Sequence, residues 1–192
     1  YRVEPAPNSS LDVRAFYNAY DRVAVPVAGE TVFEASPGPP HLLSIQRWES
    51  AARGSTYGLE FSSQWAATER WRLTAQYSLL KTEMSNVFID QGSPQQQAGL
   101  RSYLQLPGNL ELNTSAHFVD AIDSQFGAAT VHVDSYVRVD SGLLWRPRTG
   151  WEAGVWARNL LDDRHLESTS FNTTLLTEVP RTVVARVGSR VS

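Results

Sequence analysis

Tight turns alternate with long, irregular segments along this chain, and this asymmetry constrains its fold more than any other feature. Two hairpins carry tryptophan on both sides of the turn, Trp65 with Trp71 and Trp145 with Trp151. A third tight turn lies at 107–109, whereas the segments that join these hairpins are longer and polar. Short turns at one end, long loops at the other and aromatic residues at a constant height are typical of strands that cross an outer membrane.

Between the turns, apolar and polar residues alternate with a period of two, which predicts β-strands with one apolar face. Trp71, Leu73, Ala75, Tyr77 and Leu79, for example, alternate with polar residues. The predicted strands lie near residues 11–22, 54–66, 70–82, 95–106, 109–120, 132–146, 150–161 and 180–191. The expected fold class is therefore all-β, a transmembrane antiparallel up-and-down β-barrel to which these 192 residues contribute about eight strands.

The remaining segments are predicted as loops. Residues 24–53 are interrupted by Pro26 and by the Pro37-Gly38-Pro39-Pro40 run, so we expect a long loop with a short strand near 42–48. Segments 84–94, 120–132 and 162–179 are the other expected loops. The orientation follows, with tryptophan-flanked turns facing the periplasm and long loops facing outward.

Composition excludes several classes of protein but does not itself select the barrel. Hydrophobic residues make up 42% of the chain, as in soluble proteins and barrels alike, and no run of 18 apolar residues predicts a transmembrane helix. The net charge of −3 does not suit a nucleic-acid partner, and the absence of cysteine removes thiolate metal sites. Because residue 1 is tyrosine and the only methionine is Met84, we expect the chain to be part of a longer product.

Charged residues gather on the face opposite the apolar one. They are Arg14, Arg72, Arg101, Arg138, Arg158, Arg186, Arg190, Glu60, Glu111, Asp134, Asp140 and Glu152. A charge at mid-depth in lipid costs about 2–4 kcal/mol, so this face must look into the barrel. In a narrow barrel these charges would pair with one another, and in a wide one they would line a lumen or contact an enclosed domain.

Several segments resemble those of TonB-dependent receptors. Asn159-Leu160-Leu161-Asp162-Asp163-Arg164-His165 is similar to the stretch that ends their penultimate strand, and Pro180-Arg181-Thr182-Val183 to the opening of their last strand. Residues 16–21, 57–60 and 93–98 also resemble recurring barrel segments of that family.

The resemblance implies that residues 1–192 form the C-terminal part of a barrel of about 22 strands in the bacterial outer membrane. It also implies partners outside this chain: lipid, the earlier strands, a plug domain that is absent here, and the TonB complex acting through a missing N-terminal region. Such receptors take up ferric siderophores, other metal chelates or nutrients by plug displacement, so a small-molecule ligand is expected.

Eight residues are candidates for contact with a ligand or plug. They are His41, Arg47, Trp48, Arg101, His117, Arg138, Arg158 and His165. The aromatic and arginine side chains at 47 and 48 suit ligand recognition, and the others are expected on loops or on the polar face. The histidine spacing does not match a metal-binding helix, and no nucleophile motif is present, so no metal site, cofactor or catalytic residue is predicted.

Two alternatives remain. One is a self-contained eight-stranded outer-membrane barrel with a structural or adhesion role, in which the same strands close on themselves. The other is a barrel enzyme, whose catalytic groups would meet only in space.

Overall fold

The computed structural model describes residues 1–85, 92–126, 129–147, 150–167 and 177–189. These described residues form 13 strands. They are β1 (Arg2–Ala6), β2 (Ser9–Glu34), β3 (His41–Thr68), β4 (Trp71–Met84), β5 (Gln96–Leu106), β6 (Leu110–Val119), β7 (Ile122–Phe126), β8 (Ala129–Val133), β9 (Tyr136–Trp145), β10 (Trp151–Arg158), β11 (Arg164–Leu166), β12 (Glu178–Pro180) and β13 (Thr182–Ser189). Among the described residues, no helix is long and apolar enough to cross a membrane.

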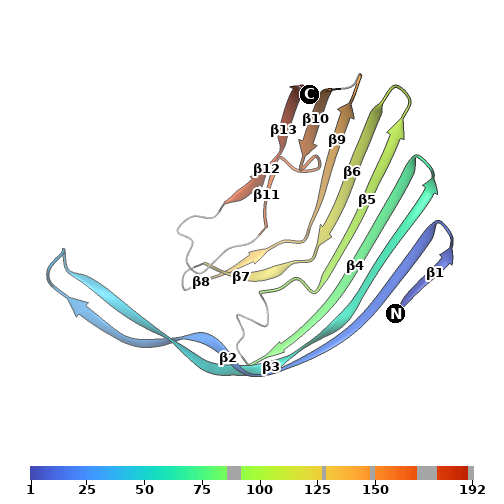
Figure 1. The fold of residues 1–192 in the computed structure, drawn as a ribbon. Coiled ribbons are helices and arrows are strands. Elements are labelled where there is room, and N and C mark those ends of the chain that lie inside the picture. Colours follow the sequence, from blue (N-terminus) through green and yellow to red (C-terminus); the bar gives the residue numbers. More distant parts are fainter. Residues whose placement is uncertain (86–91, 127–128, 148–149, 168–176, 190–192) are drawn as a thin grey trace.

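Nine strands form one curved, antiparallel sheet in the order β1-β2-β3-β4-β5-β6-β9-β10-β13 (Figure 1). Neighbours in the sheet are neighbours in sequence apart from two hairpins, β7–β8 and β11–β12, which form small sheets of their own. The sheet is open, with β1 and β13 at its two ends. This is the expected antiparallel, up-and-down wall.

The strand register gathers the apolar residues on one face. Val13, Phe61, Tyr77, Ala98, Phe118 and Val137 lie opposite one another across six strands. One residue along, the row is Asp12, Ser62, Gln76, Gly99, His117 and Arg138. A shift of one residue between any two neighbouring strands would move the apolar side chains of one strand to the polar face. The continuous rows therefore show that all six strands share one register. We call the apolar face the outer face and the polar face the inner wall.

Aromatic residues border the outer face at the turn end. Trp65, Trp71, Trp145 and Trp151 are between 37% and 47% exposed. The Trp71 indole donates to Ser102 Oγ at 2.9 Å, and that of Trp145 donates to the Gly108 carbonyl at 3.2 Å. A tryptophan with an exposed ring and a satisfied N–H suits the boundary between lipid and water.

Tyrosines mark the other border of the outer face. Tyr17 and Tyr57 stack with ring centroids 6.3 Å apart, and the Tyr57 hydroxyl donates to Glu83 at 2.8 Å. On β3, residues 57 and 65 lie at the two borders of the outer face, and the eight tilted strand residues from one to the other rise about 19 Å. That height is close to the lipid-facing band of an outer-membrane barrel.

The structure corrects the expected boundaries of the first strands. Residues 24–53 are mostly strand rather than loop, because β2 and β3 continue as a paired ribbon from the pair Val23 and Ala52 to the pair Glu34 and His41, and only residues 35–40 lie between the two strands. The expected short strand near 42–48 is part of β3. The ribbon tolerates Pro26 because it has a partner on only one side there, so a missing N–H breaks no second ladder. Figure 1 shows the ribbon running well beyond the sheet and bending away from it.

The main sheet also has nine strands rather than the predicted eight, because β1 pairs with the start of β2. The expected strand at 132–146 is divided between β8 and β9, and the segments expected as loops at 120–132 and 162–179 contain β7 and β8, and β11 and β12. The other strands agree with the prediction to within a few residues at each end. Residues 86–91 and 168–176 of the expected loops, and residues 190–192 with Arg190, lie outside the described residues.

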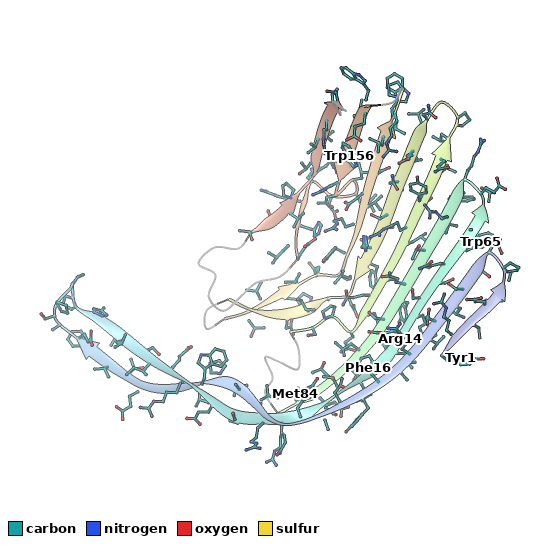
Figure 2. The ribbon with its side chains drawn as sticks, viewed as in Figure 1. Tyr1, Arg14, Phe16, Trp65, Met84 and Trp156 are labelled. Atoms are coloured by element: carbon teal, nitrogen blue, oxygen red, sulfur yellow. The ribbon has the colours of Figure 1, made fainter. Side chains whose placement is uncertain are left out.

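Trp156 lies on β10 (Figure 2), and its ring covers two glycines of the inner wall. It is opposite Gly142 on β9, and Gly154 precedes it on the same face of β10. A Cβ at Gly142 would come within 2.4 Å of the Trp156 ring, and one at Gly154 within 2.3 Å. The ring therefore occupies the space that two side chains would fill.

Replacing Leu100 by arginine tests the assignment of the two faces. Leu100 is half-exposed at mid-height on the outer face, so Leu100→Arg should lower the free energy of unfolding in lipid vesicles by about 2–4 kcal/mol. The measurement is denaturant unfolding of the full-length protein. Gln76→Arg is the control, because Gln76 faces inward opposite Gly99 and the new side chain meets open space. Equal losses from the two variants would contradict the assignment.

Replacing Gly142 tests the packing of Trp156. Gly142→Ala should cost about 1–3 kcal/mol of stability because the ring cannot stay where it is. Gly99→Ala is the matched control on the same wall, where the new Cβ would lie 3.5 Å from His117, an ordinary contact. Unfolding of both variants in vesicles should separate them. A harmless Gly142→Ala would show that Trp156 is free to move.

Candidate functional site

The inner wall is hollowed and polar. A hollow of about 450 Å³ over the middle of β2–β6 is lined by Arg14, Glu60, Gln76 and His117, among others. A second hollow, of about 520 Å³, lies nearer the tight turns and includes Arg72 and Arg101. This wall can therefore contact a polar ligand or an enclosed protein domain.

Four charged residues near the turn end of the wall are paired across the last strands of the sheet. Arg146 on the turn after β9 pairs with Glu111 of β6 and lies 4.0 Å from Glu152 of β10. Glu152 in turn lies 3.7 Å from Arg186 of β13. These pairs link the last four strands of the sheet through their inner side chains.

A denser cluster lies at the loop end of the wall, and we call it the β9–β11 network. It comprises Arg138 and Asp140 of β9, Asn159 after β10, His165 of β11, and Glu167. Arg138 Nη1 lies 3.0 Å from Glu167 Oε1, and its Nε lies 3.3 Å from Asp140 Oδ2. Since Arg138 and Asp140 project from the inner wall, β11 and its neighbours lie over that wall.

Asn159 is the hinge of this network. Its φ is 53°, a left-handed conformation that asparagine tolerates better than most residues, and its side chain is fully buried. Its backbone N–H donates to Asp140 Oδ1 at 3.0 Å, and its Nδ2 donates to the Val179 carbonyl at 3.0 Å. Its carbonyl accepts from Arg181 Nε at 3.3 Å. One residue therefore ends β10, turns the chain inward and binds the segment that precedes β13.

His165 is held against β9 by its ring. Its centroid lies 4.3 Å from that of Tyr136, and its side chain is only 10% exposed. Its Nε2 lies 3.3 Å from Glu167, and its Nδ1 lies 3.8 Å from Asp162. Within the described part of the chain, His165 Nδ1, Arg138 Nε and Asn159 Oδ1 are buried and make no hydrogen bond.

The structure brings only some of the eight candidate residues together. Arg138 and His165 meet through Glu167, and His117 lies directly opposite Arg138 on the inner wall. Arg101 lies on the same wall, and Arg158 lies exposed at the end of β10. Among the described residues, no acidic side chain is within ion-pair distance of Arg101 or Arg158.

The other three candidates lie apart from the wall, on the β2–β3 ribbon. His41 is at its tip, 3.5 Å from Glu34, and its Nδ1 lies 3.0 Å from the Pro39 carbonyl. Arg47 lies opposite Val27 along the ribbon. Trp48 is 74% exposed, one of the most exposed large apolar side chains described. The ribbon and the inner wall are therefore two separate candidate surfaces.

Sequence patterns alone did not single out Asp140, Asn159, Glu167 or Arg181 as one group. Asn159 and Arg181 each belong to a segment that carries the family resemblance, and Asp140 belongs to the charged face. Their association depends on contacts between residues about 20 positions apart, which no local pattern reveals.

The β7–β8 hairpin contains one further histidine with acidic neighbours. His132 Nδ1 lies 2.8 Å from Asp123 Oδ1, and its Nε2 lies 3.5 Å from Asp134. The hydrogen bond to Asp123 raises the pKa of His132, and the charges of Asp123 and Asp134 add to this rise. The contact therefore favours the hairpin at low pH and is lost as pH rises through that raised pKa. In the described part of the chain, no three His, Asp or Glu side chains are placed to hold a metal ion.

Replacing Asn159 tests its role as a hinge. Asn159→Ala should destabilise the protein by about 2–4 kcal/mol, because it loses a buried hydrogen bond and forces alanine into a left-handed conformation. Asn159→Gly keeps the conformation and loses only the side-chain bond, so its cost should be about half as large. Unfolding in vesicles gives both values. A glycine variant as unstable as the alanine variant would show that backbone conformation is not part of the role.

Comparison with known proteins gives the family. Residues 3–160 match the family described as TonB dependent receptor-like, beta-barrel. No curated protein matches the chain.

Similar solved structures include the ferric-catecholate import receptor Fiu of Escherichia coli K12, with a TM-score of 0.67, 15% identity, and coverage of 95% of this chain and 25% of that one. The siderophore receptor PiuA of Acinetobacter baumannii has a TM-score of 0.68, 18% identity, and coverage of 95% and 26%. The pyoverdine receptor FpvA of Pseudomonas aeruginosa PAO1 has a TM-score of 0.68, 15% identity, and coverage of 95% and 27%.

The chain thus spans about a quarter of the length of these structures, and at such identities the likeness concerns the fold alone. Members of the matched family are receptors of the outer membrane rather than enzymes. From the family match to residues 3–160, together with the lipid-suited outer face and polar inner wall, we conclude that this chain is a β-barrel segment of the TonB-dependent receptor family, located in the outer membrane.

Proposed function

We propose that this segment serves in a TonB-dependent transporter for a ferric siderophore or a related metal chelate or nutrient. The observation that supports this most is the open, curved sheet, whose hollowed inner wall suits the inside of a wide barrel. The ligand is captured from outside, and displacement of a plug domain within the barrel opens the path.

The two open edges of the sheet are an argument for partners outside this chain. Backbone N–H and C=O groups in lipid must be paired, so β1 and β13 need neighbouring strands. Earlier strands of the receptor supply them, and the plug occupies the space in front of the inner wall. The TonB complex acts on that plug from the periplasmic side.

The β2–β3 ribbon is the proposed surface for ligand capture. It extends beyond the tyrosine border of the outer face and carries the exposed Trp48 on one face and Arg47, the preceding residue, on the other. An exposed aromatic ring and a guanidinium group each suit a flat, negatively charged chelate, and Trp48 is the contact proposed here. Three of the similar solved structures are a ferric-catecholate import receptor, a siderophore receptor and a pyoverdine receptor, which agrees with this ligand class.

A self-contained eight-stranded barrel is less well supported. Such a barrel needs its first and last strands to pair, whereas β1 and β13 stand at opposite ends of the sheet order. Closure of so few strands would also bring the charged inner side chains close together. In this structure the inner wall instead has hollows of roughly 450–520 Å³, lined in part by these side chains.

Uptake of labelled iron tests the proposal. The full-length receptor, expressed in a strain without its own siderophore receptors, should accumulate iron from at least one of ferric catecholate, ferric pyoverdine or ferric hydroxamate. Accumulation should stop in a strain that lacks TonB. A receptor that folds and reaches the outer membrane but transports none of these, haem or cobalamin would contradict the proposal.

A pair of ribbon variants tests the capture surface separately. Trp48→Ala should weaken binding of the transported chelate about tenfold or more, as for other exposed aromatic anchors. Gln46→Ala, two residues away on the same ribbon, should leave binding unchanged. Fluorescence quenching on whole cells measures both affinities. Equal affinities for the two variants would exclude Trp48 from the contact.

A further inference from the structure

The β2–β3 ribbon has one regular strand edge that no described strand covers. Beyond the sheet, β3 pairs with β2 from His41 to Ser50 without a bulge on β3, and its pairing with β4 begins only at Gly54. Figure 1 shows the ribbon standing clear of the other strands. Within the described part of the chain, the outward backbone groups of residues 41–50 therefore have no strand to pair with.

The two edges of the ribbon differ in how well they can accept another strand. β2 carries Pro26, which has no N–H to donate, and a bulge between Ala28 and Thr31, where two residues oppose one. Natural proteins use proline and bulges to stop an edge from pairing with another chain. Residues 41–50 of β3 contain neither feature, so the β3 edge is open to an added strand.

The charges on the β3 edge lack a partner within the ribbon. Arg47 and Glu49 are exposed and, being two residues apart, lie on one face of β3. Across the ribbon they oppose Val27 and Val25, and among the described residues neither has an opposite charge within ion-pair distance. Trp48 lies between them on the other face and is 74% exposed. The edge thus presents a positive charge, an aromatic ring and a negative charge in succession.

A second copy of this edge is complementary to the first. When two copies pair antiparallel about a two-fold axis at Trp48, Arg47 of each lies opposite Glu49 of the other, and Gln46 lies opposite Ser50. Cβ atoms of directly opposite residues are about 4.5–5.5 Å apart, which is close enough for ion pairs. The two Trp48 rings meet on the other face as a cross-strand aromatic pair. Any other antiparallel register loses both ion pairs.

We propose that the β3 edge at residues 46–50 is a dimerisation site, at which two copies of the receptor join their ribbons antiparallel into a four-stranded sheet. Two receptors inserted the same way in one bilayer are related by a two-fold axis along the membrane normal. The ribbon bends away from the wall (Figure 1), so its strands can lie across that axis while both barrels stay in the membrane. This goes beyond the proposed transport function, because it concerns contact between two receptors rather than their ligand.

A pair of introduced cysteines tests the register. This chain has no native cysteine, so the thiols are Gln46→Cys in one tagged copy of the full-length receptor and Ser50→Cys in a second, differently tagged copy, once cysteines elsewhere are replaced. Directly opposite strand residues have the Cα separation of a disulfide. Oxidation in the outer membrane should give about fivefold more disulfide dimer from the mixed copies than from Gln46→Cys alone, because two copies of residue 46 lie four residues apart along the paired strands.

Charge reversal tests whether the occupant is a second copy. Arg47→Glu in both cysteine-bearing copies places carboxylates opposite each other at two positions, so the dimer yield should fall about tenfold. Arg47→Glu in one copy together with Glu49→Arg in the other restores both ion pairs, and the yield should return to that of the parent. All variants are compared at equal amounts of receptor in the outer membrane.

Three outcomes overturn the proposal: equal yields from the mixed copies and from Gln46→Cys alone, an unchanged yield with Arg47→Glu in both copies, and no recovery when the reversed charges are mixed. A disulfide from residue 46 to a different protein also overturns it, because that protein then occupies the edge. Iron uptake is not measured, so failure here is distinct from failure of the proposed function.

Discussion

Complete pairing of the backbone in lipid is the constraint on which the rest of this structure depends. No water is available at mid-depth, so every N–H and C=O group there needs a partner in a neighbouring strand. From β2 to β6, and on through β9 and β10, the ladder runs with one register and places apolar residues outward across every strand. The inner wall is polar as a consequence, because alternate residues have no other side to face.

The same constraint explains which strands could be predicted from sequence. Where one face of a strand meets lipid and the other meets the barrel interior, apolar and polar residues alternate strictly. The bounds of β4, β5 and β6 accordingly lie within a few residues of those predicted. Beyond the lipid, a ribbon such as β2–β3 with Pro26 can pair on one side without an apolar face. Its sequence therefore carries loop-like residues, and the strand prediction was wrong there. The start of β2 likewise gives no sign that β1 pairs with it.

The candidate site could be predicted only in part. Charges on alternate positions identify the inner wall, and Arg101, His117 and Arg138 lie on it as expected. What sequence could not give is the return of residues 159–167 onto β9, because Asn159, Asp140 and Arg181 meet through the tertiary fold. The left-handed conformation of Asn159 turns the chain back onto β9, and asparagine occurs in many loops without adopting this conformation.

The pairing of charges divides the wall residues by role. Arg138 is already paired with Asp140 and Glu167, and it would lose these interactions if it bound a ligand instead. The main role of such a paired residue is therefore to hold the shape of the wall. Arg101 and Arg158 have no acidic neighbour among the described residues. An arginine that faces the interior of a barrel without a partner keeps its hydrogen-bonding groups available to whatever enters. Among the candidate residues on the wall, Arg101 and Arg158 are therefore better suited to contact a ligand or plug than Arg138 and His165. The latter two make contacts within the chain, between β9 and residues 159–167.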